Sequence, residues 1–273
     1  MITNSNYAHY IKNGEGCFGD AFPYGDGAWT QPANFGSASF FFVEQNTYEA
    51  NCNDFTLASD GWSGQRMVFR YNDVHCTFFT THGTMQRQRG VRAIEVYNNT
   101  FHRESGFGTD GQQNAVGIGS GSTLIYNNTV TGPYKAIAEY TINRAGAPYT
   151  VWGQCNGTSV WDGNTSPAGY PCIDQPGRGA GTLLSGDPCC MVTATGTQTW
   201  PSQAAEASYV WNNTLNGAAS GATTGYPTYI MQGREYFTTP MPGYVPYTYP
   251  HPLVSTSNAT NPPPSPPANL RYR

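Results

Sequence analysis

The stretch Val96-Tyr97-Asn98-Asn99-Thr100-Phe101 decides the fold, because the same phrase occurs five times along the 273-residue chain. The phrase is an apolar residue, two variable residues, Asn, a small polar residue and a second apolar residue. Its fourth residue recurs after 26, 27, 29 and then 85 residues, at Asn46, Asn72, Asn99, Asn128 and Asn213. A repeat of this length is typical of a solenoid in which each repeat forms one coil.

Two columns of the aligned repeats are entirely apolar. Three residues before the repeated Asn the chain has Val43, Phe69, Val96, Ile125 and Val210. Two residues after it the chain has Tyr48, Val74, Phe101, Val130 and Leu215. β-Branched and aromatic residues are typical of buried strand positions, so stacked coils are predicted to bury both columns in a continuous core.

The repeated Asn predicts a corner between two strands. Asn tolerates the left-handed backbone region and makes local hydrogen bonds, and stacked Asn side chains can also bond to one another. The alternative is that these asparagines are glycosylation sites or ordinary loop residues, since Asn-Asn-Thr also forms an acceptor sequence. The corner ladder is the preferred interpretation.

The Asn ladder, the coil length and the phrase Tyr97-Asn98-Asn99-Thr100-Phe101 resemble the right-handed parallel β-helix proteins of the pectate-lyase-like superfamily, over about residues 37–235. This resemblance implies an all-β, right-handed parallel β-helix. Many members of that group bind, cleave or epimerise acidic polysaccharides, and others are adhesins or phage tailspikes. The resemblance therefore implies a polysaccharide partner without fixing an activity.

The composition favours a protein outside the cell. Charged residues are 11% of the chain, against about 25% in an average protein, while Gly (32) and Tyr (19) are abundant. A net charge of −4 without a basic run gives no footprint for nucleic acid. No apolar run reaches the roughly 18 residues needed to span a membrane.

Met1 is not followed by the basic and apolar regions of a signal peptide. We expect the chain to begin inside a longer gene product, with Met1 supplied for expression.

The seven cysteines lack the spacing of a zinc site with His partners, so no metal site is predicted. Cys52 and Cys76 follow their repeated Asn closely and are expected to lie near each other on neighbouring coils. Cys155 and Cys172 flank a Gly/Pro-rich stretch and would close a loop. Disulfides indicate a secreted or cell-surface protein, and the odd number leaves at least one thiol free or paired in trans.

A single β-helix domain is predicted over residues 1–254, with coils at about 37–145 and 206–235. Residues 146–205 are expected to form one or two coils and a large excursion. Irregular caps are expected before residue 37 and at 236–252, and residues 255–273 form a Pro-rich tail.

Residues two and four positions before each repeated Asn should point outward on one face. That face would carry the predicted substrate-binding residues together with two charged residues of the site. The binding residues are Glu44, Tyr97, Tyr126, Tyr209 and Trp211, and the charged residues are Arg70 and Glu95. The alternative is that the excursion at 146–205 covers the face.

A second group, which contains His82, Arg87, Arg89 and Arg92, precedes Glu95. A lyase that acts on uronic acids needs a cation to neutralise the carboxylate and a base to remove the adjacent proton. The predicted catalytic residues are therefore His82, Arg92, Glu95 and Arg70. Alternatively, the arginines pair with Glu95 and Glu104 and order a loop.

A glycosidase would need two carboxylates, from Glu44, Glu95, Asp60 and Glu139. The motifs of polygalacturonases, pectate lyases and alginate lyases are not found, so no named activity transfers. A non-enzymatic surface or adhesin module that self-associates into fibres is the rival hypothesis, and calcium is compatible with either function.

Overall fold

The computed structural model describes residues 2–3, 27–52, 57–84, 89–105, 113–142, 144, 152–159, 161–162, 171–181 and 203–255. Several predictions concern residues outside these ranges: most of the N-terminal cap, Arg87, Cys17, Cys189, Cys190 and the tail beyond residue 255.

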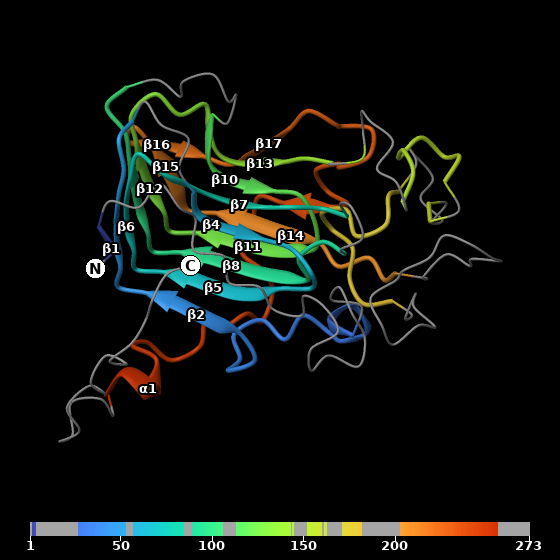
Figure 1. Ribbon diagram of the computed structural model, residues 1–273, viewed down its shortest axis with the longest axis horizontal. Helices are drawn as coiled ribbons and strands as arrows, with labels where there is room; N and C mark the ends of the chain where they lie inside the picture. The colour runs from blue at the N-terminus through green and yellow to red at the C-terminus, as the bar shows by residue number, and fades with distance from the viewer. Residues whose placement is uncertain are drawn as a thin grey trace, which may run out of the picture.

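The described residues form three mostly parallel sheets (Figure 1). The six-stranded sheet orders β18 (Tyr236–Phe237), β14 (Ser208–Trp211), β11 (Ser122–Tyr126), β8 (Ala93–Tyr97), β5 (Arg66–Arg70) and β2 (Phe41–Glu44). The seven-stranded sheet orders β1 (Ile2–Thr3), β3 (Thr47–Glu49), β6 (Asp73–His75), β9 (Thr100–His102), β12 (Thr129–Thr131), β15 (Asn213–Leu215) and β16 (Ala218–Ser220). The five-stranded sheet orders β17 (Ala222–Thr224), β13 (Ala136–Tyr140), β10 (Asn114–Ile118), β7 (Phe78–Thr81) and β4 (Leu57–Gly61).

Each coil contributes one strand to each sheet, in the order six-stranded, seven-stranded, five-stranded. β5, β6 and β7 form one such coil, and β8, β9 and β10 form the next. The hairpin of β15 and β16 is antiparallel. Two short helical turns, η2 (Ala28–Thr30) and α1 (Pro252–Ser255), lie outside the coils. The arrangement is consistent with the parallel β-helix that the repeat predicts.

Both predicted apolar columns lie in the core between the three sheets. In the middle coils their side chains are fully buried, and Val43, Tyr48 and Leu215 at the ends pack partly buried against the same cluster. The inner column is in register from Val43 to Val210 through four successive strand pairs. The prediction of a continuous core is confirmed.

The repeated asparagines form a hydrogen-bonded ladder, as predicted. The Oδ1 atom of Asn99 accepts from the backbone N–H of Asn72 at 2.9 Å and from its Nδ2 at 3.1 Å. In turn Asn99 Nδ2 donates to Phe69 O at 2.9 Å and to Asn128 Oδ1 at 3.0 Å. The same pattern runs from Asn46 to Asn213. The ladder thereby satisfies polar groups at a buried corner.

The left-handed residue of the corner is not the ladder Asn itself, which corrects the expectation. The positive φ angles, between 53° and 59°, belong to the residue before it: Gln45, Tyr71, Asn98, Asn127 and Asn212. The corner is therefore formed by two consecutive residues with different roles. One residue turns the chain, and the next directs its amide along the stack.

The described residues of the 85-residue interval insert no coil between the coils of Asn128 and Asn213, contrary to the expectation of one or two. β11 pairs directly with β14, β12 with β15 and β13 with β17. Asn128 also bonds directly to Asn213. All three sheets therefore pass directly from the coil of Asn128 to the coil of Asn213, past the intervening residues. Their described parts, the yellow-green and yellow segments, gather at the right of Figure 1.

Buried ion pairs fasten this excursion. Arg89 binds both carboxylate oxygens of Asp174, at 3.0 and 2.6 Å, and neither side chain is exposed. Arg144 binds both oxygens of Asp162 at 2.9 Å. Removing one partner would leave a buried charge uncompensated, so these pairs attach the described segments that contain Asp162 and Asp174 to Arg144 and Arg89.

The two predicted disulfides are both present. Cys52 and Cys76 join neighbouring coils, with Cα atoms 4.7 Å apart. Cys155 and Cys172 close a loop within the excursion, with Cα atoms 5.6 Å apart.

Residues 241–251, here called the C-terminal strap, were expected within an end cap but lie across the coils instead. Tyr244 contacts Trp211 and Tyr126. Further along, Thr248 accepts from Arg70, and His251 donates its N–H to Glu44 at 2.8 Å. The strap thus crosses the outer face of the six-stranded sheet from the last coil to the first.

We expect Asn99→Ala to destabilise the protein by about 3 kcal/mol, because it leaves the buried amide groups of Asn72 without an acceptor. Asn46→Ala, at the half-buried end of the ladder, should cost only about 1 kcal/mol. Urea unfolding of both variants measures the difference. Equal losses would contradict a ladder whose contribution depends on burial.

Candidate functional site

The two outward columns lie where the repeat predicts, on the outer face of the six-stranded sheet. Strand register aligns Glu44, Arg70, Tyr97, Tyr126 and Trp211 in one column. The rings of Tyr97, Tyr126 and Trp211 stack at centroid distances of 4.6 and 4.3 Å. The second column contains Glu95 and Tyr209.

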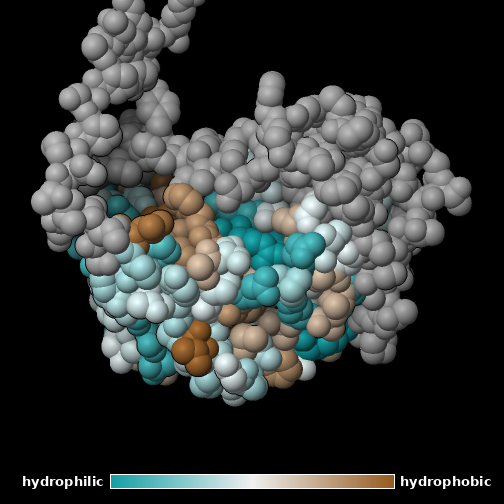
Figure 2. Space-filling model, turned by 90° about the horizontal axis from the view of Figure 1, so that it is seen from below, coloured by the Kyte–Doolittle hydropathy of each residue, from teal (hydrophilic) through white to brown (hydrophobic). Residues whose placement is uncertain are grey.

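Among the described residues, the C-terminal strap covers this face. Tyr97 is 1% exposed and Tyr126 6%. The hydroxyl groups of Tyr126 and Tyr244 are 3.2 Å apart, and the Tyr244 ring packs edge-on against Tyr126 and Trp211. Seen from below the view of Figure 1, the molecular surface mixes hydrophobic and hydrophilic side chains (Figure 2). The stacked aromatic column therefore forms a second small core under the strap.

Arg70 binds the strap to the sheet. Its guanidinium donates to Glu44 Oε2, Tyr97 Oη and Tyr247 O at 2.7 Å, and to Thr248 O at 2.8 Å. The side chain is fully buried. Because its guanidinium donates to these four acceptors, Arg70 binds the strap in this structure and not the carboxylate of a bound ligand.

Arg92 is also buried and is held by two partners. It binds both oxygens of Glu206 at 2.9 Å, and its Nε donates to Gln31 O at 3.0 Å. The alternative that the arginines pair with Glu95 and Glu104 therefore names the wrong partners for Arg89 and Arg92, which bind Asp174 and Glu206.

Glu95 lies beneath the strap. Its carboxylate accepts from the Gly36 N–H at 2.8 Å and from the Tyr244 hydroxyl at 2.5 Å. Burial raises the pKa of the Glu95 carboxyl above 4.5, against the opposing effects of these two hydrogen bonds and of the Arg70 charge. Burial and the neighbouring Glu95 carboxylate also raise the pKa of Tyr244.

His82 has different neighbours from the other predicted catalytic residues. It follows β7 in the five-stranded sheet, with Nε2 3.2 Å from Asp60. Its ring lies 5.1 Å from that of Trp62. Arg92 and Glu95 contact Glu206 and Tyr244 instead, so the predicted base and cation are bound to separate partners.

Two grooves flank the strap. The first, called the polar groove, has a volume of about 660 Å³ and lies at the last coil. It is lined by Ala33–Phe35, Ala205–Ala207, Tyr209 and Met241–Val245. Of the predicted site residues only Tyr209 lines it directly. Arg92 and Glu95 support its walls by binding Glu206 and Tyr244, which do line it.

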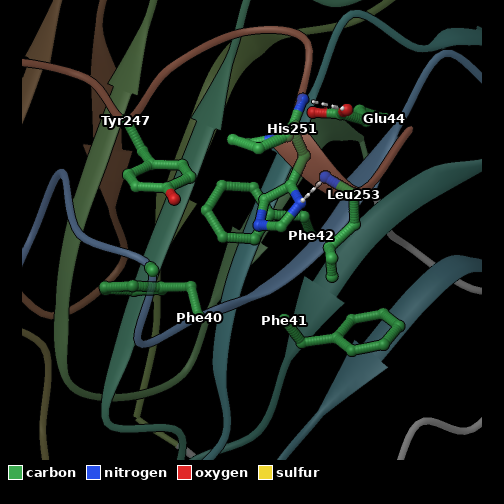
Figure 3. Close-up of a pocket in the computed structure, with 9 residues that line it drawn as sticks. Phe40, Phe41, Phe42, Glu44, Tyr247, His251 and Leu253 are labelled. Atoms are coloured by element: carbon green, nitrogen blue, oxygen red, sulfur yellow. Dashed lines mark hydrogen bonds between the residues drawn. The ribbon is translucent and has the colours of Figure 1, made fainter. Parts of the chain in front are cut away.

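The second, called the aromatic groove, has a volume of about 650 Å³ and lies at the first coil. It is lined by Ala38, Phe40–Phe42, Glu44, Tyr247 and His251–Leu253. Figure 3 shows the rings of Phe40, Phe42, Tyr247 and His251 gathered around one space. Phe41 is 41% exposed and Leu253 73%, so this end of the face presents large apolar side chains to solvent.

The sequence interpretation missed Glu206, Tyr244 and Phe41. Tyr244 belongs to a Tyr- and Pro-rich stretch whose composition gives no period, and Glu206 lies three residues before Tyr209, outside the aligned columns. The one signal that could have identified Glu206 was its position at the start of the last coil.

Within the described residues, two groups of three or more side chains could hold a metal ion. One is Cys155, Asp162 and Cys172, in which Asp162 is already bound by Arg144. The other is Cys52, His75, Cys76 and Glu104.

We expect Glu95→Gln to remove part of the pH dependence of stability. Because the pKa of Glu95 is higher in the folded than in the unfolded chain, wild-type stability falls as pH rises from about 4.5 through the folded pKa. Gln cannot ionise, so the variant should gain stability relative to wild type over that range. Urea midpoints between about pH 4 and pH 8 measure this. Parallel curves for the two proteins would contradict the assignment.

The described part of the chain contains no helix with the length and hydrophobicity that crossing a bilayer requires. The two disulfides are consistent with an extracellular location. Comparison with known protein families, with curated proteins and with solved structures finds no match for this chain.

Proposed function

We propose that the chain is a secreted right-handed parallel β-helix protein of the pectate-lyase-like kind, and that it binds a polysaccharide in the polar groove. The three stacked parallel sheets and the two disulfides support the architecture and the location. The low charge and the abundance of Tyr and Gly support a neutral, hydroxyl-rich partner.

The observation that carries the proposal is the lining of the polar groove. Tyr209 and Tyr244 place aromatic side chains beside the Glu206 carboxylate and Asn34. An aromatic ring packs against the apolar C–H face of a sugar, while a carboxylate and an amide bond to its hydroxyl groups. Arg92 fixes the Glu206 carboxylate from behind with two hydrogen bonds, so the acceptor is preorganised.

The geometry favours binding over cleavage. Hydrolysis of a glycosidic bond uses two carboxyl groups that flank it. Glu206 is the carboxylate that lines the polar groove among the described residues, and Glu95 lies under Tyr244. Arg92, the cation predicted for a lyase, is buried and bound to Glu206.

We expect Tyr209→Ala to weaken binding to the accepted polysaccharide about tenfold, through loss of one stacked ring. A glycan panel followed by titration calorimetry identifies the ligand and measures its affinity. Phe41→Ala, in the aromatic groove, is the matched control and should bind as wild type. If Phe41→Ala loses affinity and Tyr209→Ala keeps it, or if no glycan binds, the polar groove is not the site.

The aromatic groove favours a second function, self-association. It lies on β2, the last strand in the order of the six-stranded sheet. Exposed Phe41 and Leu253 there provide apolar surface at one end of the coil stack. Within the described residues no strand pairs with the outer edge of β2, and such an edge beside an apolar surface is a template for pairing with a second copy of the chain.

We expect Phe41→Glu to abolish any concentration-dependent assembly, since a carboxylate at this position would be desolvated in the contact. Size-exclusion chromatography with light scattering measures the mass. Val245→Glu, which places the same charge on an exposed apolar position in the other groove, is the control. Wild-type protein that stays monomeric at high concentration would eliminate this function.

A further inference from the structure

A cluster of metal-ligating side chains lies at the ends of three successive strands of the seven-stranded sheet. Cys52 follows β3, His75 and Cys76 lie at the end of β6, and Glu104 follows β9. One donor atom from each of the four lies within 4.8 Å of all the others. None of the four lines either groove. This cluster could not be found from the spacing of the cysteines in the sequence, because its members come from three different coils.

We propose that Cys52, His75, Cys76 and Glu104 bind a divalent cation of the zinc class when the Cys52–Cys76 disulfide is reduced. Two thiolates, one imidazole and one carboxylate make a four-coordinate set of the kind that Zn²⁺ takes in proteins. Zinc bonds of about 2.0–2.3 Å place tetrahedral donor atoms roughly 3.3–3.8 Å apart.

The observed separations are close to that geometry. Glu104 Oε2 lies 3.2 Å from Cys52 Sγ, 3.6 Å from Cys76 Sγ and 2.7 Å from His75 Nε2. Once the sulfur–sulfur bond is broken, rotation of the side chains is enough to open the set around a cation. The backbone N–H of Cys76 is bonded to His102 O at 3.0 Å, and the Cα atoms of Cys52 and Cys76 already lie 4.7 Å apart.

The second nitrogen of His75 supports the assignment independently. Its Nδ1 lies 2.6 Å from Glu49 Oε2, on the side of the ring opposite Nε2. Metal-binding histidines characteristically have such a carboxylate partner, which fixes the tautomer and the orientation of the ring. The ring also stacks on His102 at 4.4 Å and an angle of 8°, and His102 is paired with Asp73. Glu49 is therefore a positioning residue, whereas His102 makes only a ring contact with His75.

The cluster can hold either the cation or the Cys52–Cys76 disulfide, but not both, and a reductant or an oxidant converts one form to the other. A phosphine and water convert the disulfide to two thiols and a phosphine oxide. The cation then replaces the two thiol protons, which are released. In the reverse direction a small-molecule disulfide accepts two electrons from the two thiolates, takes up two protons from water and leaves as two thiols. The Cys52–Cys76 disulfide re-forms and the cation is expelled.

The test uses the full chain, reduced with a phosphine and titrated with Co²⁺ as a spectroscopic probe. We expect one Co²⁺ per chain in this cluster, with a sulfur-to-cobalt charge-transfer band and the visible bands of tetrahedral cobalt. Zn²⁺ should displace the Co²⁺ and abolish both the charge-transfer band and the visible bands. His75→Ala, at a partly exposed position that leaves the disulfide intact, should weaken binding at least tenfold. Glu49→Gln should weaken it about 10- to 100-fold.

His102→Ala is the matched control, because it removes the adjacent histidine without removing a ligand. It should bind Co²⁺ within a few-fold of wild type. The oxidised protein should show no charge-transfer band from this cluster. A band that is unchanged in both His75→Ala and Cys76→Ser would place the metal on other cysteines and overturn the proposal. Absence of any cobalt band in the reduced wild type would overturn it as well.

Discussion

The buried amide ladder is the constraint on which the rest of the molecule depends. Each ladder Oδ1 needs two donors that only the neighbouring coil supplies, so adjacent coils must stack at one rise and in one register. That register aligns the inner apolar columns and, on the opposite side of the same strands, the column from Glu44 to Trp211. A slip of one residue would turn the core residues outward along the whole sheet.

The sequence predicted what the repeat encodes locally. The apolar columns, the outward columns and the Cys52–Cys76 pair follow from positions counted from each ladder Asn. The residue that adopts the left-handed conformation could not be identified in this way, since that position holds Gln, Tyr or Asn without a common chemistry. The strap could not be predicted either. Tyr244 meets Glu95 across 149 residues and Arg70 meets Thr248 across 178, and no periodic pattern marks either contact.

Charge was the least reliable guide to the site. In a chain where charged residues are 11%, the cluster of arginines indicated a reactive centre. The structure instead places Arg70, Arg89 and Arg92 in buried pairs that attach distant segments to the coils. A buried charge needs a partner with good geometry, so an arginine in an uncharged background is as suited to fastening a loop as to binding an anion. The polar groove is lined by tyrosines and by the Glu206 carboxylate, which Arg92 holds.

The excursion between Asn128 and Asn213 also bears on how the chain reaches its final form. The first four coils meet neighbours 26 to 29 residues away, whereas the last coil must close an interval of 85 residues. The larger interval adds about 1 kcal/mol of loop-closure entropy to the first contact of the last coil. We therefore expect the last coil to assemble more slowly than the first four coils, and to do so before the strap docks on it. Tyr244 packs against Trp211 in that coil, so the strap can complete its cover of the six-stranded sheet only after the last coil has docked.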